Sequence, residues 1–199
     1  QELYDTTKTR FSLKIQDGCN NRCSYCIIPF ARGKSRSADS EFIIKQINNA
    51  VEKGFKEVIL TGIHIGQWGA DIGKNFVDLI IDIEEKTNVP RYRLGSLNPL
   101  EITPELLSVL EQSEKFCPHF HLSLQSGCDT VLKRMGRRYD TEGFLQKIRL
   151  LRKYFKNPSF TTDIICGFPG ESDEEFEKTR EFVRRVGFFD VHVFPYSRR

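Results

Sequence analysis

The sequence alternates short runs rich in β-branched or aromatic residues with longer amphipathic stretches, and this alternation restricts the possible folds more than any other feature. The predicted strands are residues 10–15, 57–60, 91–96, 119–124, 160–168 and 189–194. The connections between them carry apolar residues at helical spacing. Strands joined by helices form a parallel sheet with right-handed crossovers. Since a closed eightfold barrel needs about 250 residues, the 199 residues of this chain favour a partial (β/α)6 barrel or an open doubly wound sheet.

Capping signals indicate where the predicted helices begin. Asp39 and Ser40 precede the amphipathic residues 41–53 and are typical N-cap residues. Ser172 and Glu175 have the spacing of a capping box, in which each residue bonds the backbone of the other. These signals support the division into strands and helices.

Composition indicates a globular chain without a membrane span. Hydrophobic residues make up 39% of the sequence, which is enough for one buried core, and the net charge of +3 is too small to indicate a nucleic-acid partner by itself. No apolar run reaches the roughly 18 residues of a membrane helix, and no signal peptide is recognisable. We therefore expect a soluble, cytoplasmic protein. Residues 1–9 are interpreted as a linker, and residues 10–199 as one domain of a longer protein.

Residues suited to binding lie at or just after the ends of the predicted strands. A group of cysteines follows the first strand, Gly62 follows the second, and Ser96 is the last residue of the third. Gln125 follows the fourth strand, and Gly167 lies at the end of the fifth. The carboxyl ends of parallel strands lie at one edge of a sheet, where α/β proteins bind their ligands. The sequence therefore predicts a single site at this edge.

Three of the six cysteines, Cys19, Cys23 and Cys26, form a C-x3-C-x2-C group. Structural zinc takes four Cys or His ligands, and no second paired group is present, although folding could bring one of the four histidines to the loop. A four-iron cluster held by three thiolates leaves one iron open to an outside ligand, which suits an enzyme. The histidines are His64, His119, His121 and His192, and the other cysteines, Cys117, Cys128 and Cys166, are predicted to be ordinary buried or half-buried thiols. No helix or strand is predicted in the cysteine loop through residue 38.

The cysteine spacing, with Tyr25 directly before the last cysteine, resembles the signature of the radical S-adenosylmethionine (SAM) superfamily. This resemblance implies a [4Fe–4S] cluster on the three cysteines, with the amine and carboxylate of SAM bound to the open iron. It implies that the reduced cluster cleaves SAM to methionine and a 5′-deoxyadenosyl radical. The superfamily has the partial (β/α)6 barrel, so the resemblance selects that fold.

Within the superfamily, the chain is similar to the methylthiotransferases in the stretches KIQDGCNNRCSYCIIPFARGKSRS, LTGIHIGQWG, HLSLQSGCDTVLKRMGRRY, DIICGFPGE and HVFPYSRR. TGIHIG and FPYSRR resemble the branch that methylthiolates N6-threonylcarbamoyladenosine next to the tRNA anticodon. Two alternatives remain open. One is a methylthiotransferase for isopentenyladenosine tRNA or for a ribosomal protein, and the other is a non-catalytic module in which the cysteines only bind a metal.

The family pattern assigns cofactor-binding roles to residues around the cysteines. Tyr25 is expected to pack on the adenine of SAM or on the cluster, and Gly62 to bond the SAM amine through its backbone. Gln125 is expected to bond ribose hydroxyls, with Ser96 and Ser123 as weaker candidates. Each of these residues could instead serve only the turn or core in which it lies.

Further cofactor-binding roles fall on two later motifs. Arg137, in the M-x-R-x-Y pattern, is expected to bind the SAM carboxylate because a guanidinium can do so with two hydrogen bonds, and it is preferred over Arg138. Ile165 and Gly167 are expected to cover the adenine. Glu171 falls one position later than the superfamily pattern requires, so its role is open.

The basic residues Arg32, Lys34 and Arg36 follow the cysteines and are candidates for contacts with tRNA phosphates. The resemblance implies two domains beyond this chain, an N-terminal domain with a second [4Fe–4S] cluster and a small RNA-binding C-terminal domain. It also implies an electron donor such as flavodoxin or ferredoxin. The sequence does not indicate the oligomeric state.

Overall fold

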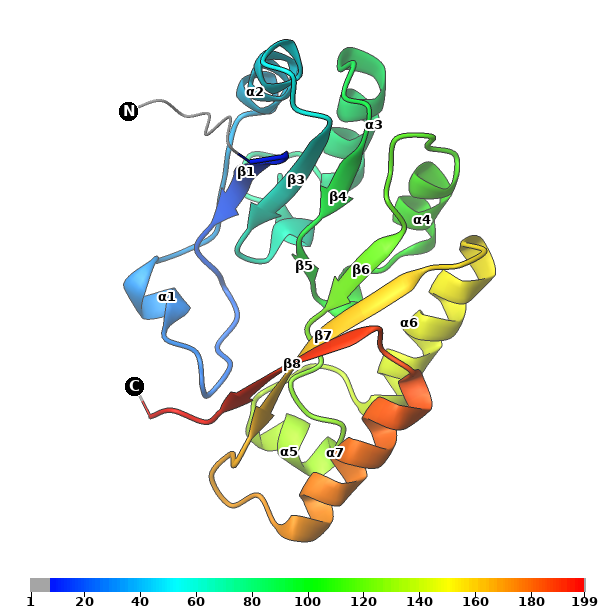
Figure 1. Cartoon of the computed structure of the whole chain (residues 1–199). Helices are drawn as coiled ribbons and strands as arrows, with labels where there is room; N and C mark the ends of the chain where they lie inside the picture. Colours follow the sequence, from blue (N-terminus) through cyan, green and yellow to red (C-terminus); the bar gives the residue numbers. More distant parts are fainter. Residues whose placement is uncertain (1–7, 199) are drawn as a thin grey trace.

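The computed structural model describes residues 8–198, and its strands form a curved layer in two sheets (Figure 1). The parallel strands are β1 (Arg10–Asp17), β3 (Glu57–Gly62), β4 (Tyr92–Leu94), β5 (Ser96–Leu97), β6 (His119–Leu122), β7 (Ser159–Cys166) and β8 (Asp190–Pro195). The first sheet has the order β2-β1-β3-β4, with β2 (Arg36–Ser37) antiparallel to β1, and the second has the order β5-β6-β7-β8. Most of the predicted linker at residues 1–9 lies outside the described residues.

The two sheets are joined where β4 runs into β5. Only Gly95 separates these strands, and its N–H donates to the Leu60 carbonyl oxygen of β3 at 2.8 Å. One continuous stretch of chain therefore pairs with the first sheet and then with the second. No strand ladder among residues 8–198 joins β8 back to the first sheet, so the barrel is partial, as predicted.

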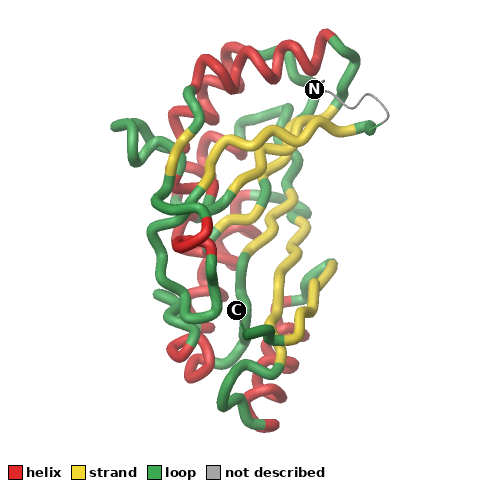
Figure 2. The backbone as a smooth tube through the Cα atoms, turned by 90° about the vertical axis from the view of Figure 1, so that its left-hand side faces the viewer, coloured by secondary structure: helices red, strands yellow, loops and turns green. Residues whose placement is uncertain are grey.

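The helices that connect the strands lie on one side of the sheets, and the other side is left uncovered by them (Figure 2). They are α2 (Ser40–Glu52), α3 (Phe76–Lys86), α4 (Pro104–Glu111), α5 (Asp129–Arg134), α6 (Thr141–Tyr154) and α7 (Asp173–Val186). Shorter turns are α1 (Ile28–Ala31), η1 (Ile65–Gln67) and η2 (Pro99–Glu101). The predicted alternation of strand and helix is confirmed. Within residues 8–198, no helix combines the length and the apolar character needed to cross a membrane.

The predicted helix caps are formed. The Asp39 carboxylate accepts a hydrogen bond from the Phe42 N–H at 3.0 Å and begins α2. The Ser172 hydroxyl accepts from the Glu175 N–H at 3.2 Å, and the Glu175 carboxylate accepts from the Ser172 N–H at 3.1 Å. Both caps occupy N–H groups that the first turn leaves without partners.

The strand residues alternate between an apolar core and a polar concave face. On β6, Phe120 and Leu122 are fully buried toward the helices, and the Phe120 ring lies 5.5 Å from Phe116 and 5.3 Å from Phe155. The intervening residues of β6, His119 and His121, point to the opposite face. Because the core lies on the helix side of the sheets, the polar side chains on the concave side are available for ligand binding.

The prediction that the cysteine loop through residue 38 has no helix or strand is wrong, because it contains α1 and β2. The Ser37 hydroxyl of β2 donates to the Gln16 side-chain oxygen at 2.9 Å, and the Ser37 N–H donates to the Asp71 carboxylate at 3.0 Å. These partners are distant in sequence, so no local pattern could have shown the strand.

Candidate active site

The cysteine loop, residues 18–37, leaves β1 at its carboxyl end and returns beside it as β2. Gly18 has a φ of 71°, and a Cβ at this position would lie 2.0 Å from the Lys34 carbonyl oxygen. The Cys19 N–H donates to the Gly33 carbonyl oxygen at 3.1 Å. The two limbs of the loop are therefore in backbone contact, which a side chain at position 18 would prevent.

The tip of the loop is attached to the end of α5. The Ser24 N–H donates to the Met135 carbonyl oxygen at 3.0 Å, and the Ser24 hydroxyl donates to the Arg134 carbonyl oxygen at 2.8 Å. These carbonyls are among those that the last helical turn leaves without partners. The loop thus lies between the first sheet and the M-x-R-x-Y motif, which the sequence had associated with the same site.

The three loop cysteines are free and half-buried. A hydrogen bond with His64 lowers the pKa of the Cys19 thiol, whereas burial raises the pKa of Cys26. Only one set of three Cys, His, Asp or Glu side chains among the described residues has its ligand atoms within 4.8 Å of one another, and it contains no cysteine. A tetrahedral zinc ion with bonds of about 2.3 Å would need sulfur atoms about 3.8 Å apart. The loop therefore favours a cluster, in which each thiolate binds a different iron.

His64 is a site residue that the sequence analysis did not assign. It adopts a left-handed backbone conformation, with φ of 58°, two residues after the end of β3. Its Nε2 lies 2.7 Å from the buried Glu101 carboxylate, and its ring also bonds Cys19. Burial opposes protonation, but the bonds to Cys19 and Glu101 outweigh it and raise the pKa of His64 to about 9. An imidazolium here stabilises the Cys19 thiolate. The sequence had named it only as one of the four histidines that folding could bring to the cysteine loop, and it is the histidine that bonds Cys19.

Arg137 lies against the cysteine loop, whereas Arg138 is exposed. The Arg137 Nε donates to the Tyr139 hydroxyl and its Nη2 donates to the Ser123 carbonyl oxygen, both at 2.8 Å. Its Nη1 lies 3.5 Å from the Cys23 sulfur, on the lining of a cavity of about 140 Å³. The guanidinium is thus held by two strong hydrogen bonds and turns one nitrogen toward the cysteines.

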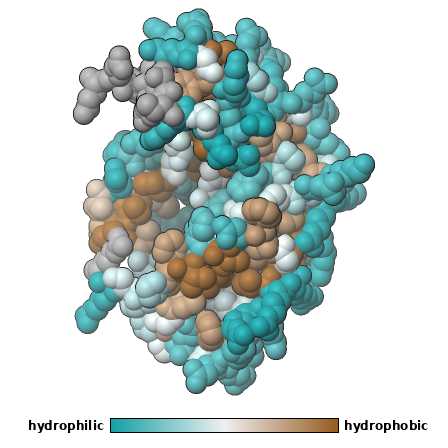
Figure 3. All heavy atoms as spheres, in the orientation of Figure 1, coloured by the Kyte–Doolittle hydropathy of each residue, from teal (hydrophilic) through white to brown (hydrophobic). Residues whose placement is uncertain are grey.

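A larger cavity, of about 310 Å³, lies between the cysteine loop and the strands β7 and β8. It brings together Tyr25, Gln125 and Ile165, which the sequence analysis had assigned to the cofactor. Cys26 and Asp163 also line this cavity. In Figure 3, apolar surface lies over α1 and over β8 on either side of a hollow. The cavity offers apolar walls with a few polar groups, as expected for a nucleoside site.

Three other predicted residues do not line that cavity. A Cβ on Gly62 would lie 2.4 Å from the Gln16 carbonyl oxygen, so close strand packing by itself accounts for glycine there. Ser96 is exposed on β5. Gly167 is also exposed, and its N–H donates to the Glu171 carboxylate at 2.7 Å. Glu171 therefore closes the turn after β7 from its later position.

The basic residues Arg32, Lys34 and Arg36 are exposed at the edge of the cysteine loop. Arg32 and Arg36 each lie 3.9 Å from the Asp17 carboxylate, a separation at which an exposed pair contributes little. Their charges thus remain available to a partner. Arg134, in contrast, forms an ion pair with Glu175 at 2.7 Å.

The family profile and the relatives that match this sequence are those that the cysteine spacing and the other sequence motifs predicted. The sequence profile described as "Radical SAM superfamily" matches residues 13–183. Threonylcarbamoyladenosine tRNA methylthiotransferase MtaB from Bacillus subtilis is 46% identical over 196 residues, which are 98% of this chain and 44% of the relative. The protein of the same name from Thermotoga maritima is 42% identical, over 96% of this chain and 44% of its own. A tRNA-2-methylthio-N(6)-dimethylallyladenosine synthase from Finegoldia magna is 37% identical, over 94% and 41%. The chain spans less than half the length of these relatives.

Solved structures share the fold at low sequence identity. TsrM from Kitasatospora setae, a radical S-adenosylmethionine methyltransferase solved with cobalamin and a [4Fe–4S] cluster, has a TM-score of 0.76 at 17% identity. The match covers 92% of this chain and 36% of TsrM. Coproporphyrinogen III oxidase HemN from Escherichia coli has a TM-score of 0.63 at 19% identity, covering 94% of this chain and 43% of HemN. At these identities the likeness concerns the fold alone.

Proposed function

The chain belongs to the radical SAM superfamily, and from this premise we propose that residues 10–199 are the catalytic core domain of a tRNA methylthiotransferase. The observation that carries the proposal is the cysteine loop, held at the carboxyl edge of the sheets beside Arg137 and an apolar cavity. Residues 1–9 then link this core to a preceding domain, and the whole protein works in the cytoplasm.

Cys19, Cys23 and Cys26 are the residues that would hold a [4Fe–4S] cluster. The chemistry of the donor set fits, because all three thiols are free and half-buried on one loop. When reduced, the bound cluster supplies the electron that splits the sulfonium bond of SAM into methionine and a 5′-deoxyadenosyl radical. His64 stabilises the thiolate of Cys19, and Arg137 supplies positive charge beside Cys23.

The cavity beside the loop is the proposed nucleoside site for SAM. Tyr25 and Ile165 provide apolar contact to the adenine, and Gln125 offers a neutral side-chain amide to ribose hydroxyls. Gly62, Ser96 and Gly167 remain proposed contacts outside this lining. The Arg137 nitrogen on the smaller cavity is positioned to bind the methionine carboxylate.

The proposed substrate is N6-threonylcarbamoyladenosine in tRNA. This choice rests on the 46% identity to one MtaB protein, against 37–40% to three dimethylallyladenosine synthases, which keeps that second substrate as the alternative. Arg32, Lys34 and Arg36 would contact tRNA phosphates. In the whole protein, a preceding domain would hold a second cluster used in the transfer of the CH3–S group, and a flavodoxin or ferredoxin would be the electron donor.

The first test addresses the cluster and SAM. The protein is reconstituted anaerobically with iron and sulfide and reduced with dithionite. Its EPR spectrum is then recorded with and without SAM, and 5′-deoxyadenosine is measured. The spectrum should change on addition of SAM, and 5′-deoxyadenosine should form. Cys23→Ser should lose both properties, whereas Cys166→Ser, a half-buried free thiol on β7, should keep them. A cluster that does not respond to SAM would contradict the proposal.

The second test addresses the substrate and uses the full-length protein. Two tRNAs are supplied, one with N6-threonylcarbamoyladenosine and one with isopentenyladenosine, and the methylthiolated nucleosides are measured by mass spectrometry. Product from the first tRNA alone supports the proposal. Product from the second alone assigns the chain to the other branch.

A further inference from the structure

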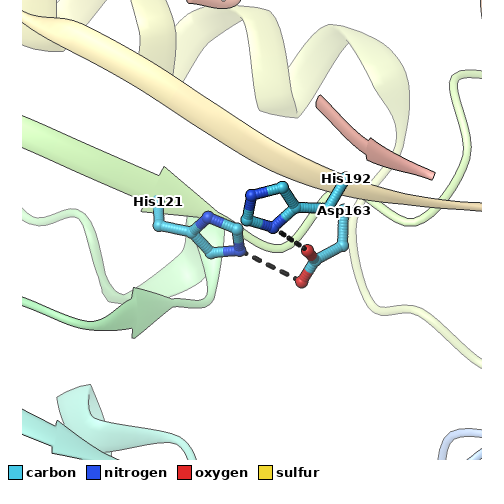
Figure 4. Close-up of side chains that lie close together, drawn as sticks. All are labelled: His121, Asp163 and His192. Carbon is cyan, nitrogen blue, oxygen red and sulfur yellow. Dashed lines mark hydrogen bonds and ion pairs between the residues drawn. The ribbon is translucent and has the colours of Figure 1, made fainter. Parts of the chain in front are cut away.

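A cluster of three side chains lies on the concave face of the second sheet. His121 is on β6, Asp163 on β7 and His192 on β8. Asp163 pairs with His192 in the β7–β8 ladder, and His121 pairs with Thr161, which precedes Asp163 by two residues. Because side chains alternate along a strand, all three point to the same side of the sheet. Figure 4 shows them directed toward one another.

The distances within the cluster suit a metal ion. His121 Nε2 lies 3.0 Å from one Asp163 oxygen and His192 Nδ1 lies 3.3 Å from the other, and one ligand atom from each residue lies within 4.8 Å of the others. A tetrahedral ion with bonds of about 2.1 Å needs ligand atoms about 3.4 Å apart. Closing the set to that spacing requires only small side-chain rotations, and the side chain of His192, which is 54% exposed, has room for them.

His121 also has a hydrogen-bond partner on the ring nitrogen that faces away from Asp163. His121 Nδ1 lies 2.9 Å from the Thr161 hydroxyl, whereas His192 Nε2 lies 3.6 Å from the exposed Asp190 carboxylate, beyond hydrogen-bond distance. In metal sites the second nitrogen of a histidine ligand typically donates to such an oxygen, which directs the other nitrogen's lone pair to the metal. A simple ion pair between a carboxylate and imidazoles does not require the bond from Thr161 to His121.

We propose that His121, Asp163 and His192 bind a divalent transition-metal ion of the zinc, cobalt(II) or iron(II) class. Two neutral imidazoles and one carboxylate are a ligand set that these ions take, and the carboxylate provides the negative charge. Three protein ligands leave at least one coordination position open. Asp163 also lines the cavity beside the cysteine loop, so the site borders space that water can enter.

This site is distinct from the cysteine loop, and its test does not depend on the proposed activity. Cobalt(II) is the probe, because it reports its own coordination through visible ligand-field bands. All samples carry Cys19→Ser, Cys23→Ser and Cys26→Ser, so that the loop thiolates do not compete. Cobalt is titrated anaerobically, and the stoichiometry, the visible absorbance and the thiolate charge-transfer absorbance are measured. Circular dichroism checks that each variant is folded.

The expected result is one cobalt ion per chain, with ligand-field bands and without thiolate charge transfer. Asp163→Asn and His192→Ala should weaken binding by more than the roughly 10- to 100-fold typical of losing an outer-shell partner. His119→Gln is the matched control, since His119 lies on the same strand and face and bonds Thr161 but is not a ligand. It should bind cobalt as the parent does. The proposal is overturned if the parent binds no cobalt, or if the folded His192→Ala protein binds cobalt equally well. In either case His121, Asp163 and His192 would form only a row of hydrogen bonds.

Discussion

Replacing Gly18 by alanine should open the cysteine loop, and the structure supplies the magnitude. Gly18 has a φ of 71°, a conformation that costs an ordinary residue about 1–2 kcal/mol. The new Cβ would lie 2.0 Å from the Lys34 carbonyl oxygen, well inside the 3.4 Å at which ordinary contact begins. Overpacking of this kind typically costs a further 1–3 kcal/mol, roughly. Gly73 provides the control, because its φ is also 71° and nothing lies within 4 Å of its Cβ position.

The assay is urea unfolding of the cluster-free protein, combined with hydrogen exchange at the Cys19 amide. Gly73→Ala should lower the free energy of unfolding by about 1–2 kcal/mol and leave the amide protected. Gly18→Ala should lower it by about 2–5 kcal/mol, or open the loop locally, in which case the Cys19 amide loses the protection that its bond to Gly33 provides. Equal losses in the two variants, with equal protection of the amide, would refute the claim that this backbone contact forms the loop.

Three further predictions concern the rest of the molecule. Arg137→Lys should lower the free energy of unfolding by about 1–3 kcal/mol, because a lysine cannot bond both the Tyr139 hydroxyl and the Ser123 carbonyl oxygen. Arg138→Lys, at an exposed position, should leave the free energy of unfolding unchanged, and equal effects of the two variants in urea unfolding would contradict this. Hydrogen bonds from Arg134, Thr130 and the Ser172 backbone lower the pKa of Glu175 to about 2, so its stabilising contribution is complete above its ordinary pKa of 4.5 and is lost as the pH falls toward 2. Glu175→Gln should therefore flatten the acid limb of a plot of unfolding free energy against pH, while Glu174→Gln should not. Phe120→Ala should cost about 3–5 kcal/mol in urea unfolding, since Phe120 is fully buried, and a loss below about 1 kcal/mol would show that the aromatic cluster is not the core.

The sequence by itself was sufficient to predict the order of the parallel strands and of the helices between them, and the caps of those helices. Hydrophobic periodicity depends on which face of an element is buried, and the caps of α2 and α7 depend on residues within one helical turn. The cysteine spacing was sufficient for the superfamily, because three thiolates on one loop are a local feature. Arg137 could be preferred over Arg138 from its motif, and it is the arginine that lies beside Cys23.

Only the tertiary structure decided the features whose partners lie far apart along the chain. Strand β2 exists because Ser37 bonds Gln16 and Asp71, and His64 acquires its role from Glu101 and Cys19. In the sequence, none of the four histidines belongs to a paired metal-ligand motif. The pairing register of β6, β7 and β8 brings His121 and His192 to the Asp163 carboxylate. Neighbouring parallel strands place their paired residues about 4.8 Å apart, although at least one helix separates these residues along the chain. Local patterns determine which elements form, and the pairing of those elements determines which side chains meet.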